Sequence, residues 1–169
     1  MTSARSSFLG VLLLLAPLAR AEQPTQTDAT TLKGQHMMLD ASKQMHKGSK
    51  MMMSAADEMM QGGNVEQAKK AMSRGDEMMT TADHNMKDAV QMMTEHGGMM
   101  DSSKMMMDAN KMMMDGRQTM MSAAEGVARP EDVAGAREDM MQGRQMMMNG
   151  EQKMSDAQRM MSDRMKMAK

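Results

Sequence analysis

The sequence lacks cysteine, tryptophan and tyrosine, and its one phenylalanine, Phe8, lies within the first 21 residues. The absence of cysteine excludes a disulfide framework and a lipid-modified cysteine. Beyond residue 21 the chain also lacks isoleucine, and only six of its 148 residues there are leucine or valine. That share is well below what packed globular domains use. An ordinary core of aromatic and branched aliphatic side chains is therefore excluded.

Methionine takes the place of the missing residue types, since 34 of those 148 residues are methionine. They form singles, doublets and triplets, and most recur every seven positions, as in the tandem segments KMMMDAN (104–110) and KMMMDGR (111–117). A seven-residue spacing places side chains on one nearly straight stripe of an α-helix. Because methionine, alanine, lysine, glutamine, arginine and glutamate all favour helix, the sequence predicts an all-α protein with a loosely packed core.

Residues 1–21 have the pattern of a secretory signal peptide. Arg5 supplies the positive start, residues 8–18 the short apolar segment, and Ala19-Arg20-Ala21 a cleavage site, so cleavage is expected after Ala21. The apolar segment is too short to span a bilayer comfortably, and no other segment is a candidate span. We therefore expect an exported chain with no stable membrane insertion.

The charge balance excludes two classes of partner. The whole chain carries 21 basic and 22 acidic residues, and removal of residues 1–21 takes away Arg5 and Arg20. The remaining chain is slightly acidic, so it has no electrostatic footprint for nucleic acid and no basic face for anionic lipid.

The rest of the chain is predicted to be one helical region after a short polar segment. Residues 22–31 are polar and are expected to form a disordered lead-in. The Met-rich helical region then covers residues 32–169, with helices at about 32–61, 64–96, 99–125 and 130–167. Short connections between segments of similar length are typical of an antiparallel helical bundle of three or four helices.

Glycine and proline mark the boundaries of these segments. Gly62-Gly63 is a helix stop signal, and Asn64 with Gln67 forms a capping pair for the following helix. The methionine phase also shifts by one residue at this point, as a turn between helices would require. At the last boundary, Pro130 suits the first turn of a helix. That helix carries the series Val133, Met140, Met147, Met154 and Met161.

Gly97-Gly98 allows two interpretations. The series Met79, Met86, Met93, Met100, Met107, Met114 and Met121 passes through it without a shift, as one continuous helix from Asn64 to Glu125 would require. Two glycines inside that helix would cost about 2 kcal/mol relative to alanine. A turn would give four segments of similar length, and we favour the turn.

The methionines are too numerous for a core stripe alone. The second core position of each heptad often holds a polar residue, such as His96, Ser103 or Asn110. Triplets spread over about 200° of a helix surface at 100° per residue, so Met105 and Met112 are expected to lie partly in water. Motifs for nucleophilic, phosphate-binding or zinc-dependent catalysis are absent, and we do not expect an enzyme.

Exposed thioether sulfur supports sacrificial redox chemistry. Methionine takes one oxygen from hypochlorous acid or a similar oxidant, and the sulfoxide can be reduced enzymatically. The residues expected to react are the four triplets: Met51, Met52, Met53, Met105, Met106, Met107, Met112, Met113, Met114, Met146, Met147 and Met148. No cysteine, tryptophan or tyrosine competes for the oxidant.

In its export signal, Met-rich helices and missing aromatics and cysteine, the whole chain resembles the periplasmic methionine-rich peptides of bacterial reactive-chlorine defence. This resemblance implies a periplasmic scavenger without a cofactor, whose working groups are the methionines themselves. It also implies a periplasmic methionine sulfoxide reductase as the partner, with self-association left open.

Binding of a soft metal ion is the alternative, because thioethers select Cu(I) and Ag(I). The best candidate ligands surround one histidine: Met92, Met93, His96, Met99 and Met100. Most other methionines avoid the spacing of three or four residues that lets one helical face hold an ion. A third hypothesis, a Met-lined surface for apolar clients, lacks aromatic or leucine anchors.

Titration with Cu(I) separates the metal hypothesis from the redox hypothesis. A metal site needs a fixed ligand set and gives a definite stoichiometry that competes with a chelator. We expect only weak, graded binding. A tight site that is lost in the double variant His96→Ala, Met99→Leu would instead favour a metal-binding protein.

Overall fold

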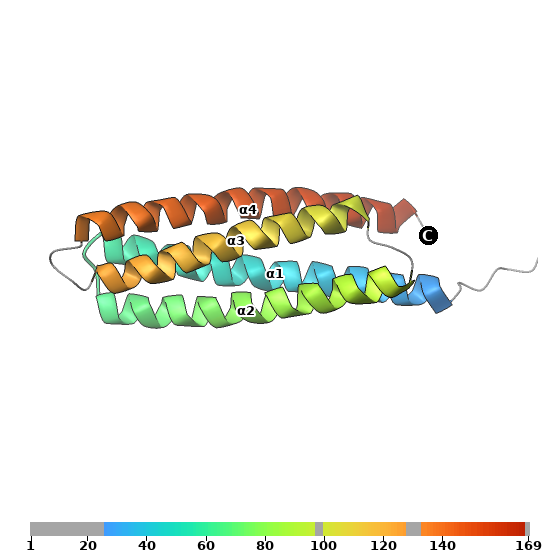
Figure 1. Cartoon of the computed structure of the whole chain (residues 1–169), viewed down its shortest axis with the longest axis horizontal. Coiled ribbons are helices and arrows are strands. Elements are labelled where there is room, and N and C mark those ends of the chain that lie inside the picture. The colour runs from blue at the N-terminus through green and yellow to red at the C-terminus, as the bar shows by residue number, and fades with distance from the viewer. Residues whose placement is uncertain (1–25, 97–99, 128–132, 168–169) are drawn as a thin grey trace, which may run out of the picture.

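The protein is a bundle of four α-helices that lie side by side along one long axis (Figure 1). The computed structural model describes residues 26–96, 100–127 and 133–167. The helices are α1 (Gln26–Met60), α2 (Val65–His96), α3 (Asp101–Gly126) and α4 (Val133–Met167), and the described part of the chain contains no strand. The predicted all-α bundle is confirmed, with four helices.

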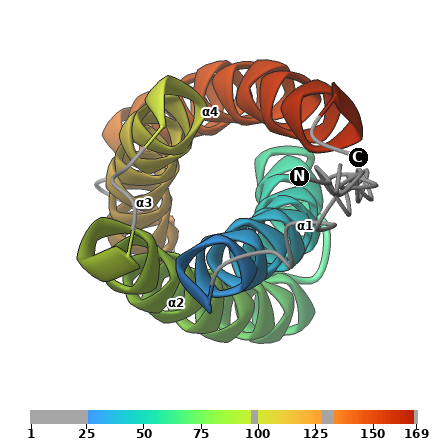
Figure 2. The same cartoon turned by 90° about the vertical axis from the view of Figure 1, so that its right-hand side faces the viewer.

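The bundle consists of two antiparallel hairpins. Helices α1 and α2 pack closely against each other, as do α3 and α4, whereas contacts between the two pairs are sparse. Viewed along the bundle, the first hairpin forms one side and the second hairpin the other (Figure 2). The contacts inside each hairpin therefore differ in kind from the contacts that join the hairpins.

The turn between α1 and α2 follows the signals read from the sequence. Gly62 has a φ of +78°, which glycine adopts without strain. The N–H of Gly63 donates to the carbonyl oxygen of Glu58 at 2.9 Å, closing the helix end. The N–H of Gln67 donates to Oδ1 of Asn64 at 3.0 Å and caps the start of α2. The predicted stop and capping pair are both present.

Other boundaries differ from the prediction or lie outside the described residues. Helix α1 begins at Gln26, so residues 26–31 of the expected disordered lead-in are helical. Polar residues can extend an established helix at little cost, because each added residue gains a backbone hydrogen bond. Helices α2 and α3 are separate, although Gly97-Gly98 lies outside the described residues. Residues 1–25, with the expected signal peptide, and Pro130 also lie outside them.

Every helix buries one column of methionines with seven-residue spacing. Among the described residues, fifteen methionines are buried: Met38, Met45, Met52 and Met59 on α1, Met72, Met79, Met86 and Met93 on α2, Met106, Met113 and Met120 on α3, and Met140, Met147, Met154 and Met161 on α4. On α1, α2 and α4 these methionines follow the seven-residue spacing of the sequence.

The predicted column is wrong on α3. Met100, Met107, Met114 and Met121 are only partly buried, and the preceding residue of each later pair, such as Met106 or Met113, occupies the core. The buried face of α3 is set by the small residues Ala109, Gly116 and Ala123, which let α4 approach. Because α2 ends at His96 and α3 begins as a separate helix at Asp101, continuity of the sequence pattern does not carry the buried face from one helix to the next.

Small residues form the seam inside each hairpin. A Cβ atom on Gly48 would lie 2.7 Å from the carbonyl oxygen of Gly75, and a Cβ on Gly75 would lie 2.7 Å from that of Gly48. Gly116 and Gly143 face each other in the same way across α3 and α4. The paired backbones are therefore in direct contact. A buried methionine then covers the small residue opposite, as Met52 covers Gly75.

The two hairpins are copies of one unit. Gly48 and Gly116 are 68 residues apart, as are Gly75 and Gly143, and the segment MMSAA occurs at 52–56 and again at 120–124. The same offset relates Met38, Met45 and Met52 of α1 to the buried methionines of α3, and the four buried methionines of α2 to those of α4. The counterpart of Met59 is Val127. An internal repeat of this length explains why the four segments have similar patterns.

The seam predicts opposite effects for alanine at two glycines. Gly48→Ala should destabilise the protein by about 1–3 kcal/mol, because the added methyl group forces the backbones apart. Gly135→Ala is the matched control on α4, where a Cβ has open space, and it should stabilise by about 0.5–1 kcal/mol. Urea unfolding measures both. Stabilisation by Gly48→Ala would contradict direct backbone contact.

Candidate functional site

The structure separates the predicted reactive methionines by depth. Four are fully buried: Met52, Met106, Met113 and Met147. Two are exposed, Met51 at 37% and Met148 at 38%. The other six, Met53, Met105, Met107, Met112, Met114 and Met146, are partly buried. Each triplet thus contributes one side chain to the core and two to its margins, and Met105 and Met112 reach water as expected.

The most exposed methionines were not among the predicted reactive residues. They are Met141 (55%), Met160 (46%) and Met167 (79%), and all three lie on α4. Two of them belong to doublets, in which one residue fills the core and its neighbour turns outward. Their polar sequence neighbours, such as Asp139 and Gln142, could have indicated this exposure, because the polar face of an amphipathic helix faces water.

Polar side chains join the two hairpins. Between α2 and α3, Arg117 pairs with Asp76, and Nδ2 of Asn110 donates to Oδ1 of Asp83 at 2.6 Å. Between α1 and α4, Nε2 of Gln158 donates to Oγ of Ser42 at 2.5 Å. Contacts between the two hairpins are sparse compared with those inside each hairpin. The joint between the hairpins therefore contains less apolar packing than the seams within them.

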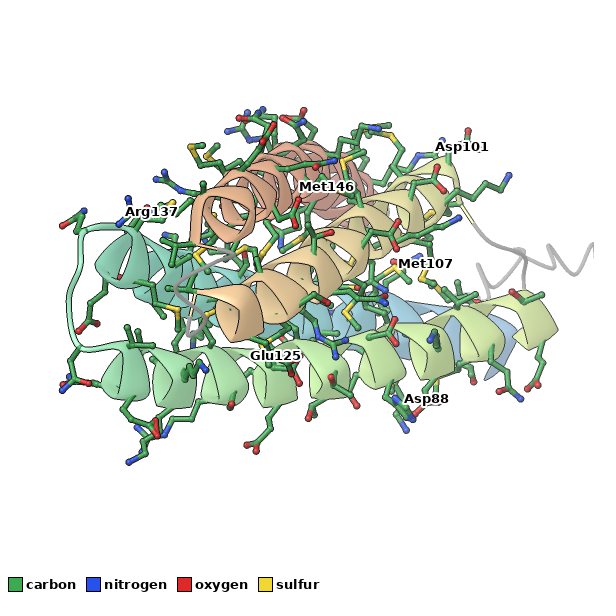
Figure 3. The ribbon with its side chains drawn as sticks, turned by 60° about the vertical axis from the view of Figure 1, so that its left-hand side comes forward. Asp88, Asp101, Met107, Glu125, Arg137 and Met146 are labelled. Atoms are coloured by element: carbon green, nitrogen blue, oxygen red, sulfur yellow. The ribbon has the colours of Figure 1, made fainter. Side chains whose placement is uncertain are left out.

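A groove of about 450 Å³ follows the joint between α2 and α3. Its lining includes two partly buried methionines, Met107 and Met114, together with Asp83, Lys87, Asn110 and Lys111. Met107 lies on the side of α3 that faces α2 (Figure 3). Small oxidants in this groove would meet two thioether sulfurs directly.

The internal repeat creates a second groove between α1 and α4, of about 330 Å³. Here His46 occupies the place of Met114, and Glu151 that of Asp83. Nδ1 of His46 lies 3.1 Å from Oε1 of Glu151. The repeat has therefore kept the acidic group of the groove, whereas Ser155 occupies the place of Lys87 and the partly buried sulfurs lie on the α2–α3 side.

Among the described residues, the sulfurs of Met93, Met100 and Met114 contact hydrogen-bond donors. Oγ of Ser103 lies 3.8 Å from the sulfur of Met93, and Nε2 of Gln35 lies 3.7 Å from that of Met100. Nη1 of Arg117 lies 3.8 Å from the sulfur of Met114. A thioether is only a weak acceptor, so these contacts hold the side chains loosely.

Asp83 is a buried carboxylate at the joint, and it accepts hydrogen bonds from the side chains of Lys87 and Asn110. Burial raises the pKa of Asp83, but hydrogen bonds from Lys87 and Asn110, with the charge of Lys87, outweigh burial and leave the pKa below its usual value of 3.8. The Lys87 ammonium lies 2.7 Å from Oδ2 of Asp83. The folded protein therefore favours the charged carboxylate at this position.

Of the candidate metal ligands, the structure describes the side chains of Met92, Met93 and Met100, and the sulfurs of Met93 and Met100 face different neighbours. The sulfur of Met93 faces Ser103 inside the core, and the sulfur of Met100 faces Gln35 of α1. Met99 and the side chain of His96 lie outside the described residues. Within the described ranges, histidine, aspartate and glutamate form no group of three that could hold a metal ion.

Comparisons with known proteins found no match among protein-family models, curated proteins or solved structures. Among the residues that the structure describes, no helix is long and apolar enough to cross a membrane.

The charge of Asp83 predicts an acid-sensitive joint between the hairpins. Because its folded pKa is lowered, its contribution is present above the unfolded pKa of about 3.9 and is lost as pH falls through the folded value. Asp83→Asn should therefore lower the free energy of unfolding at pH 7 by about 1–3 kcal/mol, and this difference should shrink below pH 4.

Chemical unfolding of both proteins across this pH range measures the effect. Asp88→Asn is the matched control, because Asp88 is exposed on the same helix and points away from the bundle (Figure 3). The control should follow the wild-type protein at every pH. A difference between Asp83→Asn and wild type that stays constant through acidification would contradict a role for the carboxylate charge.

Proposed function

We propose that the protein is an exported scavenger of reactive chlorine or related oxidants, in which methionine is oxidised reversibly to the sulfoxide. A periplasmic methionine sulfoxide reductase would regenerate it. The observation that carries the proposal is the surplus of sulfur outside the core. Fifteen methionines suffice to fill the buried columns, yet more than half of the described methionines lie partly or fully in water.

Packing alone does not account for this surplus. Leucine specifies a helical core better than methionine, and an exposed apolar side chain contributes little to stability. A scavenger, in contrast, benefits from each additional accessible sulfur. The exposed residues Met141, Met160 and Met167 and the groove residues Met107 and Met114 provide such sulfurs without any contribution to the buried columns.

The chemistry needs no catalytic group. A thioether attacks hypochlorous acid and acquires its oxygen, while the chlorine leaves as chloride and a proton is released. Sulfur loses two electrons in this step, and the product is methionine sulfoxide, which reductases convert back. The absence of cysteine, tryptophan and tyrosine leaves methionine as the main target, so little oxidant is consumed by side chains that cannot be repaired.

The fold supplies sulfur at three depths, and we infer that it reacts in that order. Exposed methionines on α4 meet the oxidant first, and partly buried methionines at the hairpin joint follow. The buried columns react only when helices separate, because a side chain without solvent contact is shielded from a dissolved oxidant. Local opening of a bundle with few inter-hairpin contacts makes this last reserve available.

Hypochlorite titration tests the proposal by its stoichiometry. Most of the 34 methionines that follow residue 21 should be converted, and the intact mass should rise in steps of about 16 Da because each event adds one oxygen. Peptide mapping at limiting oxidant should find sulfoxide first at Met141, Met160 and Met167, and last at Met45 and Met86.

A triple variant supplies the control for this order. Leucine at positions 141, 160 and 167 should remove the first phase and leave the later phases, because these side chains lie outside the core. Resistance of more than half of the methionines to excess oxidant would contradict a scavenging function. Equal oxidation of exposed and buried methionines would contradict the inferred order.

A further inference from the structure

The sulfurs of Met100 and Met114 are partly buried and share one feature. Each contacts a nitrogen donor, Gln35 Nε2 at 3.7 Å and Arg117 Nη1 at 3.8 Å respectively. Both are also reached from grooves, Met100 at the end of the bundle and Met114 between α2 and α3. At both positions a thioether sulfur, which is a weak acceptor, faces an N–H donor at a place that a dissolved oxidant can reach.

From this geometry we propose that Met100 and Met114 are built-in sulfoxide sites, at which the oxidised side chain is bound by the fold and does not disrupt it. The proposal rests on methionine oxidation as the proposed function and adds which positions tolerate it. Oxygen transfer from hypochlorous acid forms the S–O bond, breaks the O–Cl bond and releases chloride and a proton. The new oxygen is a strong acceptor, unlike the thioether it replaces.

The distances suit this exchange. A hydrogen bond from nitrogen to oxygen spans about 2.9 Å, so an oxygen directed obliquely from the sulfur toward the donor fits within the present separation. At Met114 the donor is a guanidinium, whose hydrogen bonds are charge-assisted and about twice as strong as neutral ones. Arg117 has five N–H groups, and its Nε already serves Asp76 of α2. It can hold the sulfoxide and keep the hairpins joined.

Within the described residues, Met93 is the one buried column methionine whose sulfur contacts a donor, Oγ of Ser103 at 3.8 Å. Met52 and Met79 pack against glycine and its backbone in the seam. No hydrogen bond to the sulfur of either residue is found within the described part of the chain, so an oxygen added there would lack a donor. A buried polar group without a hydrogen-bond partner destabilises the folded state. Oxidation therefore has two outcomes in this fold: it is accommodated at Met100 and Met114, and it opens the packing at the columns.

Met107 is the matched control for Met114. It lies one heptad earlier on α3, lines the same groove and is also partly buried. Within the described residues, no hydrogen-bond donor contacts its sulfur, because the side chain three residues later, Asn110, donates to Asp83 instead. The two positions differ mainly in the presence of Arg117.

Glutamine, whose carbonyl oxygen stands in for that of the sulfoxide, tests the proposal without any oxidant. Met114→Gln should unfold at least about 3 °C higher than Met107→Gln, which corresponds to roughly one added hydrogen bond in a domain of this size. The advantage should disappear when Arg117→Leu is added to both variants. Likewise, Met100→Gln should lose stability when Gln35→Leu is added, beyond the loss that Gln35→Leu causes alone.

Partial oxidation of the wild-type protein tests the same sites directly. After hypochlorite treatment at about one oxygen per molecule, a brief protease pulse should leave a resistant fraction enriched in sulfoxide at Met100 and Met114. Sulfoxide at Met107 should be enriched in the digested fraction. Equal unfolding temperatures for the two glutamine variants, or equal partition of the sulfoxides, would overturn the proposal. Either result would leave the total oxidation stoichiometry, and hence the scavenging function, untouched.

Discussion

Helix backbones touch inside each hairpin, and this contact sets the geometry of the whole bundle. Glycine and alanine recur on the facing sides of the paired helices, so that Gly48 meets Gly75 and Gly116 meets Gly143 at van der Waals distance. With so little space between the axes, a branched or aromatic residue at these positions would not fit. The long, unbranched methionine side chain instead folds over the small residue of the partner helix and fills the margin of the seam.

This arrangement explains how a protein almost without leucine, valine and aromatics can have a core. Close approach of the backbones replaces bulky side chains as the source of packing, and methionine supplies the remaining apolar surface. The joint between the hairpins is built differently, from Asp76, Asp83, Asn110 and Arg117 and their counterparts on α1 and α4. Polar groups at a joint tolerate the polarity of a sulfoxide better than an apolar interface would.

The internal repeat places a groove at each of two equivalent positions of the joint, one between α2 and α3 and one between α1 and α4. In one copy the position at the groove holds Met114, and in the other it holds His46. The accessible sulfur is therefore concentrated along α3 and α4, where Met107, Met114 and Met141 lie. A duplicated hairpin provides a second set of buried columns for packing, while its surface positions are free to diverge.

Much of the helical organisation could be predicted from the sequence, because glycine and the capping pair act locally. The turn at Gly62-Gly63 and the buried columns of α1, α2 and α4 follow from heptad spacing alone. The column of α3 could not be predicted by extending the series from Met93, since α3 is a separate helix with its own phase. The positions of Ala109, Gly116 and Ala123 would have given the correct face, because only small residues allow the seam.

The depth of each methionine within a triplet was also beyond the sequence pattern. Met112, Met113 and Met114 are chemically identical, and only the phase of the helix decides which one is buried. Pairings between helices such as Arg117 with Asp76 join residues 41 positions apart and depend on how the hairpins dock. Helical periodicity carries no information on that docking, so the sulfur–donor contacts became visible only in the structure.

The central claim is that methionine serves as core and as reactive group in the same molecule, and one measurement tests it most directly. Circular dichroism and intact mass should be followed together during hypochlorite titration. The account predicts that helicity persists while exposed and partly buried sulfurs are consumed, and then falls cooperatively as the fifteen buried methionines are oxidised. Full helicity at complete oxidation would show that the buried methionine columns are not the core. Loss of helix after the first few oxidations would show that the exposed methionines are needed for the fold, so that core and reactive groups are not separate sets of residues.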